Sequence, residues 1–79
     1  MDFNTIAQIV RFHRKKAELS RNDLAMFADV GKTVIFDIEH GKDTIQFASL
    51  LKVLSALNIR LDFKSPFMEA FYPTQNSEI

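Results

Sequence analysis

Residues 19–42, LSRNDLAMFADVGKTVIFDIEHGK, hold two helix-sized blocks separated by a short turn, and this stretch decides the fold. Ser20 is a good helix N-cap. Asp23 stands three residues later, where its carboxylate can accept a hydrogen bond from the cap amide and complete a capping box. Leucine, alanine and phenylalanine then follow at helical spacing. The sequence therefore predicts a helix from about residue 21 to residue 28.

The corner between the two blocks is Asp29-Val30-Gly31, in which aspartate and glycine tolerate turn conformations. Helical spacing resumes over Lys32 to His40, and Gly41 is a typical C-terminal stop. DNA-reading proteins use such a turn between two short helices to place the second helix in the major groove. Helical hairpins of this size also occur for purely structural reasons. The pattern alone leaves DNA binding and a generic small helical bundle as alternatives.

Apolar spacing predicts two further helices, one on each side of this stretch. The first spans residues 5–19, with Asn4 or Asp2 as its N-cap. After a loop at residues 44–46, residues 47–57 carry a broad apolar face and Asn58 ends the helix. Five phenylalanines at helical spacing are expected to lie mostly in the core: Phe3, Phe12, Phe27, Phe36 and Phe47. Of these, Phe12 lies off the main apolar stripe of its helix.

The period of the pattern changes after residue 58. Residues 59–64, Ile59-Arg60-Leu61-Asp62-Phe63-Lys64, alternate apolar with charged side chains, as half-buried strands do. A lone strand must pair, and nothing else in the chain has the pattern of its mate. The simplest partner is the same strand of a second copy. We therefore predict a homodimer with a small intermolecular sheet.

The tail, residues 65–79, is aromatic at first and polar at its end. The polar end is expected to be disordered, whereas the aromatic part is too apolar to be left in water. It is interpreted as a dimer brace, as a docking segment for a partner, or as a cover folded back over the strand pair. The predicted organisation is thus residues 1–58, a helical domain; residues 59–64, a dimerisation strand; and residues 65–79, the tail.

Ten basic and ten acidic residues give a net charge of zero, so the distribution of charge is more informative than its sum. Residues 11–21 are basic, with one glutamate among Arg11, Arg14, Lys15, Lys16 and Arg21. The cluster is either a solvated helix face or a surface for phosphates. The chain has no cysteine, no apolar run of about 18 residues and no signal peptide pattern at residues 1–10, which favours a cytoplasmic protein.

Many positions at fixed spacing resemble the phage-repressor, or Cro/C1-type (XRE-like), helix-turn-helix family, over roughly residues 5–58. The matching positions are Val10, Arg14, Ala17, Leu19-Ser20, Leu24-Ala25, Ala28, Val30, Ile35, Ile38-Glu39, Gly41-Lys42 and residues 50–57. The resemblance implies an all-α bundle of four to five helices that binds double-stranded DNA. With the strand of residues 59–64 added, the expected fold is this bundle with a short C-terminal β-strand that pairs across a homodimer.

The segment LLKVLSALNIRLDFK, residues 50–64, resembles the HipB-like antitoxins, a branch of the same superfamily in which such a strand joins two subunits. This resemblance implies a bacterial, nucleoid-associated repressor that autoregulates its operon and binds a HipA-like serine/threonine kinase toxin. It implies no enzymatic activity and no cofactor. The alternative is a helical dimeric protein-interaction module with little or no DNA binding.

The family pattern places DNA contacts at the start of the second helix, on the exposed face of the third and in the loop that follows. In this chain these are Ser20 and Arg21; Gly31, Lys32, Thr33, Phe36 and Asp37; and His40 and Lys42. Lys32 and Thr33 are the expected base contacts, and Asp37 can accept from a cytosine amine. Phe36 is expected to pack on a thymine methyl or to cover Phe27. Bidentate donors are few on this face, so DNA shape is expected to contribute.

Arg14 and Glu39 occupy positions that form a structural ion pair in this family. A different interpretation groups Glu39 with His40 and His13 as an acid–base or metal site. Two histidines and one carboxylate without further ligands support it only weakly, so no metal and no catalytic residue are predicted.

Overall fold

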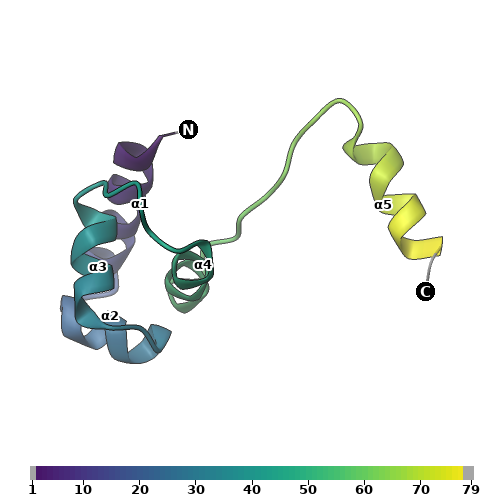
Figure 1. Cartoon of the computed structure of the whole chain (residues 1–79). Coiled ribbons are helices and arrows are strands. Elements are labelled where there is room, and N and C mark those ends of the chain that lie inside the picture. Colours follow the sequence, from purple (N-terminus) through teal and green to yellow (C-terminus); the bar gives the residue numbers. More distant parts are fainter. Residues whose placement is uncertain (1, 78–79) are drawn as a thin grey trace.

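The computed structural model describes residues 2–77, which form five helices and no β-strand. Figure 1 shows the first four helices gathered into one body and the fifth set apart from them at the end of an extended segment. The predicted all-α class is confirmed. In chain order the helices are α1 (Phe3–Lys16), α2 (Arg21–Ala28), α3 (Lys32–Glu39), α4 (Phe47–Ala56) and α5 (Met68–Ser77).

Helices α1 and α2 begin where a side chain satisfies a free backbone amide. Asp2 is the N-cap of α1 and accepts a hydrogen bond of 2.8 Å from the amide of Thr5, so Asp2 and not Asn4 holds this position. Ser20 caps α2 through a capping box, in which its hydroxyl oxygen accepts from the amide of Asp23 over 3.0 Å. The Asp23 carboxylate accepts in turn from the amide of Ser20 over 3.2 Å. The predicted box is confirmed.

Left-handed residues follow four of the helices, and Glu18, with φ 59°, is the one after α1. Asp29 closes α2 with φ 58° and allows the amide of Val30 to reach the carbonyl of Ala25 over 3.0 Å. Gly41, with φ 72°, follows α3, and Asn58, with φ 58°, follows α4. Gly31 has an ordinary negative φ and serves as the N-cap of α3. The corner of the helix-turn-helix therefore turns at Asp29.

A small aliphatic core joins the four helices. Its largest fully buried side chains are Val10, Leu24, Ile35 and Val53, one from each of α1 to α4. Helix α3 packs against both α1 and α2, and α4 packs mainly against α2. Val30, in the corner, is half-buried against this core. The core thus holds α2 and α3 in one orientation, with one face of α3 left to solvent.

The phenylalanines expected in the core are exposed instead. Their exposed fractions run from 44% to 71%, for Phe3, Phe12, Phe27, Phe36 and Phe47. Helical spacing placed them correctly on helices but does not say where the helix axes meet. Leucine, isoleucine, valine and alanine already fill the centre, so the larger rings lie at its edges.

The strand predicted at residues 59–64 is not formed in the single chain, so this expectation is corrected. Half-buried Ile59 still packs against the core, but Leu61 and Phe63 are exposed on the segment that leads to α5. A strand needs a hydrogen-bonded neighbour, and one copy offers none. The tail also differs from expectation, because its polar end is helical through Ser77. Residues 78 and 79 of that end lie outside the described residues. Across residues 2–77, no helix is long and apolar enough to cross a membrane.

Candidate nucleic-acid interface

A buried ion pair connects the first helix to the third. Arg14 Nε donates to Glu39 Oε2 over 2.6 Å, and Arg14 Nη2 donates to Glu39 Oε1 over 3.0 Å. Arg14 Nη1 also donates to the carbonyl of Leu19, just before α2, over 2.9 Å. The two side chains are 10% and 0% exposed. The ion pair expected from the sequence is therefore present. Arg14 also holds the backbone at Leu19, just before α2.

Arg21 is a second basic partner of the same carboxylate. Its Nε donates to Glu39 Oε1 over 3.1 Å. Burial raises the pKa of Glu39, but the hydrogen bonds and charges of Arg14 and Arg21 outweigh it and leave the pKa below its ordinary value. The hydrogen bond with Glu39 raises the pKa of Arg14. Both groups stay ionised, so one carboxylate orients two arginines beside the helix-turn-helix.

Three side chains form a stack on the exposed side of α2 and α3. The guanidinium carbon of Arg21 lies 5.5 Å from the centre of the Phe36 ring. The Phe36 ring stacks on the imidazole of His40, with centroids 3.8 Å apart and planes 22° apart. His40 Nδ1 lies 2.7 Å from the carbonyl oxygen of Phe36. Among the described residues, Phe36 is therefore packed by Arg21 and His40, whereas the sequence suggested Phe27.

A shallow cavity lies between the starts of α2 and α3. Its volume is about 680 Å³ on the α2 side of Lys32. A neighbouring cavity of about 260 Å³ is lined by Arg21, Asn22, Lys32, Thr33 and Phe36. Lys32 and Thr33 are exposed in the first turn of α3. Gly31 makes no side-chain cap, so the first amides of α3 have no capping side chain. The side chains of Lys32 and Thr33 and the uncapped backbone amides at the start of α3 therefore lie on one surface.

Ser20 lies at the other end of this surface. Its hydroxyl oxygen accepts from the Asp23 amide, which leaves the hydroxyl proton free to be donated outward. The N-terminus of α2 also carries a positive dipole end. Phosphates fit this chemistry, although the Asp23 carboxylate occupies part of the same helix end.

Asp37 and Lys42 form an exposed pair beyond the centre of α3. Lys42 Nζ lies 3.5 Å from Asp37 Oδ2. The pair reduces the repulsion that an isolated Asp37 would exert on DNA phosphates, at the cost of a less available lysine. Of the nine DNA-contact residues expected from the sequence, seven have exposed side chains or backbone, and Arg21 and Asp37 are half-buried.

Three polar residues of this face were not singled out from the sequence. Asn22 lines the cavity beside Arg21, and its amide can both donate and accept. Thr44 and Gln46 line another cavity of about 170 Å³ next to Lys42, where Gln46 is the uncapped start of α4. The signal available in the sequence was the position of these residues at predicted helix starts, where amides point outward.

The basic cluster of residues 11–21 does not act as one surface. Arg14 is buried and paired, which removes it from solvent. Arg11, Lys15 and Lys16 are exposed on α1, and Lys16 Nζ lies 5.8 Å from the Phe12 ring centre. The exposed basic residues nearest α2 in sequence are thus Lys15 and Lys16.

The acid–base or metal interpretation is not supported by the arrangement of its residues. His13 Nδ1 lies 2.7 Å from the carbonyl oxygen of Ile9, His40 stacks on Phe36, and Glu39 is taken by two arginines. Over residues 2–77, histidine, aspartate and glutamate form no cluster of three or more suited to a metal ion.

The geometry agrees with a comparison to known families. The helix-turn-helix family pattern, of the Cro/C1 type, matches residues 10–64, more than half of the chain. The chain belongs to this family. A relative of this helix-turn-helix protein in Sinorhizobium fredii (strain NBRC 101917 / NGR234) is named "Uncharacterized HTH-type transcriptional regulator y4mF". The two are 39% identical over 61 residues, which cover 77% of this chain and 80% of the relative.

Proposed function

We propose that this helix-turn-helix protein is a sequence-specific DNA-binding transcriptional repressor that reads the major groove with α3. One observation carries the proposal: Glu39 of α3 binds Arg14 of α1 and Arg21 of α2, which braces an exposed α3 start beside an exposed α2 start. That is the arrangement in which one helix reads bases and the other approaches the backbone. The family match and the name of the relative support DNA-binding regulation.

The first turn of α3 supplies the proposed base contacts. Lys32 donates to guanine acceptors, and Thr33 offers a hydroxyl or a methyl to a base edge. Gly31 keeps the α3 start free of a side chain, so the backbone can approach the DNA closely. Phe36, held flat by its stack, presents an apolar edge to a thymine methyl, and Asp37 accepts from a cytosine amine.

Residues around this turn supply the proposed phosphate contacts. Ser20 donates its hydroxyl at the α2 N-terminus, and Arg21 offers its outer nitrogens while Nε stays on Glu39. His40 and Lys42 meet the backbone on the far side of α3. These contacts add affinity without reading sequence.

We propose that two copies form a homodimer through residues 59–64, since an operator with two half-sites requires two copies of the helix-turn-helix. The charges select one register. A two-fold antiparallel pair centred on Leu61 places Arg60 opposite Asp62 and Ile59 opposite Phe63 of the other copy. A pair centred on Asp62 would oppose two carboxylates and set Arg60 against Lys64. A pair centred on Arg60 would oppose two guanidinium groups.

Mass measurements test this dimer. Light scattering of the full chain at micromolar concentration is expected to give the mass of a dimer. Arg60→Asp is expected to weaken the dimer, and Arg60→Asp combined with Asp62→Arg to restore it, because the cross-strand pair is re-formed with reversed charges. A monomeric mass for the unmodified chain would refute the shared strand.

The finer proposal is that the protein is the antitoxin of a HipBA-type toxin–antitoxin system. The resemblance of residues 50–64 to HipB-like antitoxins supports it. In this proposal the protein acts in the bacterial cytoplasm at the nucleoid, represses its own operon and binds a HipA-like serine/threonine kinase toxin. Co-purification of the tagged chain with the product of the adjacent reading frame tests it. An adjacent frame with no kinase pattern would remove the kinase partner.

A mobility-shift assay with the protein's own upstream DNA tests DNA binding. We expect a specific complex whose affinity falls with salt, and we expect Lys32→Ala and Thr33→Ala to weaken it. Lys52→Ala is the matched control, because Lys52 is an exposed lysine on α4 and lies outside the proposed interface. If Lys32→Ala and Lys52→Ala bind equally well, Lys32 is not a reader.

A second candidate function is a helical protein-interaction module with little or no DNA binding. Many exposed aromatic rings favour it, as does the stack of Phe36 on His40 at the centre of the reading face. Absence of any salt-dependent DNA complex in the same assay would favour this alternative.

A further inference from the structure

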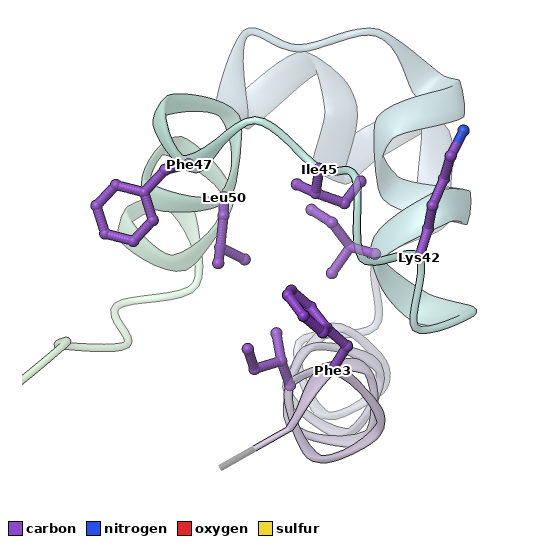
Figure 2. A pocket seen from close by; sticks show the side chains of 7 residues that line it. Phe3, Lys42, Ile45, Phe47 and Leu50 are labelled. Atoms are coloured by element: carbon purple, nitrogen blue, oxygen red, sulfur yellow. The ribbon is translucent and has the colours of Figure 1, made fainter.

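An apolar pocket opens on the side of the bundle where α1 and α4 begin. Its volume is about 150 Å³, and its lining comes from the start of α1, from α3 and the loop after it, and from the first turn of α4. Figure 2 shows Phe3, Ile45, Phe47 and Leu50 around it, with the Lys42 side chain at one side. An apolar cavity of about this volume takes up a benzene ring. One aromatic side chain therefore matches it in size.

The chain also carries an aromatic face that its own body leaves uncovered. Phe67, just before α5, is 80% exposed, and Phe71, one helical turn later, is 49% exposed. Tyr72 and Met68 flank them on the same side, by the i, i+3 and i, i+4 spacing of a helix. Figure 1 shows α5 standing away from α1 to α4. Such a face gains stability when it is buried.

We propose that α5 of one copy lies along α4 of a second copy and inserts Phe71 into this pocket. The proposal rests on the paired strand described under the proposed function. In the register centred on Leu61, Lys64 of one copy lies opposite Asn58 of the other, at the C-terminal end of that copy's α4. The chain that leaves the strand therefore enters α5 beside the second copy, and not beside its own α4.

The lengths of the segments agree with this path. Helix α4 has 10 residues and is about 15 Å long. From Lys64 to Phe67 the chain spans at most about 10 Å, and less where residues 65–68 turn, since the amide of Met68 donates to the carbonyl of Ser65 over 3.3 Å. The turn from Phe67 to Phe71 adds about 6 Å. From Asn58 back to Leu50 is about 12 Å along a helix, so Phe71 comes level with Leu50, which lines the pocket.

Apolar side chains follow this path among polar ones. Phe47 and Leu51 are exposed one turn apart on α4, and Leu51 borders a cavity lined by Leu54, Ile59 and Leu61 together with Ser55, Asn58 and Arg60. Apolar contacts are therefore available from the pocket to the proposed strand. Phe67 would make such contacts while Phe71 fills the pocket.

Charges at the two surfaces are complementary. Glu69 borders the aromatic face of α5, and Lys42 lines the pocket. Lys42 is otherwise paired only loosely, at 3.5 Å from Asp37. Docking α5 in the proposed direction brings Glu69 to the side of the pocket that carries a positive charge.

Sedimentation equilibrium of the full chain tests the docking. Phe71→Ala is expected to raise the dimer Kd at least about tenfold, because two rings leave their pockets. Phe12→Ala is the matched control: Phe12 is also an exposed phenylalanine, and it lies on the face of α1 opposite the core. Lys42→Glu and Glu69→Lys are each expected to weaken the dimer, and the two together to restore it. Equal Kd values for Phe71→Ala and Phe12→Ala would overturn the docking.

A disulfide cross-link distinguishes α5 of the same copy from α5 of a second copy as the segment that fills the pocket. The chain has no cysteine, so a Lys42→Cys, Glu69→Cys double variant carries one defined pair. Oxidation is expected to give a band of dimer mass on a non-reducing gel, and an oxidised monomer would overturn the exchange of α5 between copies.

The docking and the repressor proposal can fail separately. If Phe71→Ala dimerises and shifts DNA like the unmodified chain, the docking fails while the repressor proposal stands. If the unmodified chain dimerises through α5 but gives no mobility shift with DNA, the repressor proposal fails while the docking stands.

Discussion

Arg14 of α1 and Glu39 of α3 lie 25 residues apart in the chain, yet Arg14 Nε donates to Glu39 Oε2 over only 2.6 Å. The contact is bidentate, because Arg14 Nη2 binds the other oxygen. Arg21 adds a third hydrogen bond from the start of α2. In the described residues, no buried side-chain nitrogen or oxygen lacks a hydrogen-bond partner. One carboxylate therefore connects α1, α2 and α3, the three helices around the helix-turn-helix.

Replacement of Glu39 by glutamine is expected to lower the free energy of unfolding by about 3 kcal/mol, because it leaves the buried Arg14 cation without its counter-charge. Urea denaturation measures the change. Glu18→Gln is the matched control, since Glu18 is exposed and its replacement should stay within about 0.5 kcal/mol. Equal stability of the two variants would show that the ion pair does not hold the helices together.

Acid is expected to weaken the unmodified protein through the same carboxylate. The pKa of Glu39 is lower in the folded chain than its ordinary value, so its contribution is complete above the unfolded pKa, about 4.3 for glutamate. It is lost as the pH falls through the folded pKa. Urea unfolding from pH 7 to pH 3 should therefore show the stability gap between the unmodified protein and Glu39→Gln narrowing at the acid end. A gap that stays constant with pH contradicts the assignment.

Loss of the α2 cap is expected to cost about 1 kcal/mol of stability in Ser20→Ala, because the hydroxyl that accepts from the Asp23 amide is removed. Thermal and urea unfolding measure it. Ser55→Ala provides the comparison, as Ser55 is an exposed residue inside α4, where alanine is the better helix former. The cap is unimportant if both variants change stability equally.

Gly41→Ala is expected to destabilise the protein by about 1–2 kcal/mol, because Gly41 has φ 72° and an added Cβ would lie 2.8 Å from Asn4 Oδ1. Adding Asn4→Ala removes that contact but not the backbone strain. The double variant should therefore recover only part of the loss in urea unfolding. Full recovery would mean that crowding alone, and not the left-handed backbone, requires glycine.

Arg21→Lys is expected to weaken DNA binding about tenfold while keeping the net charge. Lysine lacks the planar fork that contacts Glu39 and Phe36 and that we propose to contact a phosphate as well. Mobility shifts at two salt concentrations measure this effect. Arg11→Lys, an exposed change on α1, should bind as the unmodified protein does. Unfolding of both variants by urea checks that the loss is not one of folding, and equal DNA affinities would remove Arg21 from the interface.

Local chemistry made much of the architecture predictable from the sequence. The ends of α2, α3 and α4 were expected within one or two residues of where they lie, because Ser20, Gly41 and Asn58 act on the backbone beside them. The Arg14 and Glu39 contact was expected only through resemblance to a family, since nothing local links residues in different helices.

The sequence by itself determined that α2, α3 and α4 are helices, where they begin and end, and that the chain carries a helix-turn-helix, because capping, left-handed stops and apolar spacing act over a few residues. It placed the first helix at residues 5–19, whereas α1 is Phe3–Lys16, and it did not predict α5. Only the tertiary structure decided that aliphatic side chains fill the core while Phe3 and Phe47 border a pocket. It also decided that Arg21 binds Glu39 and covers Phe36, and that residues 59–64 form no strand in one copy. Burial and pairing depend on which surfaces meet in space, and the spacing of residues along one helix or strand does not contain that information.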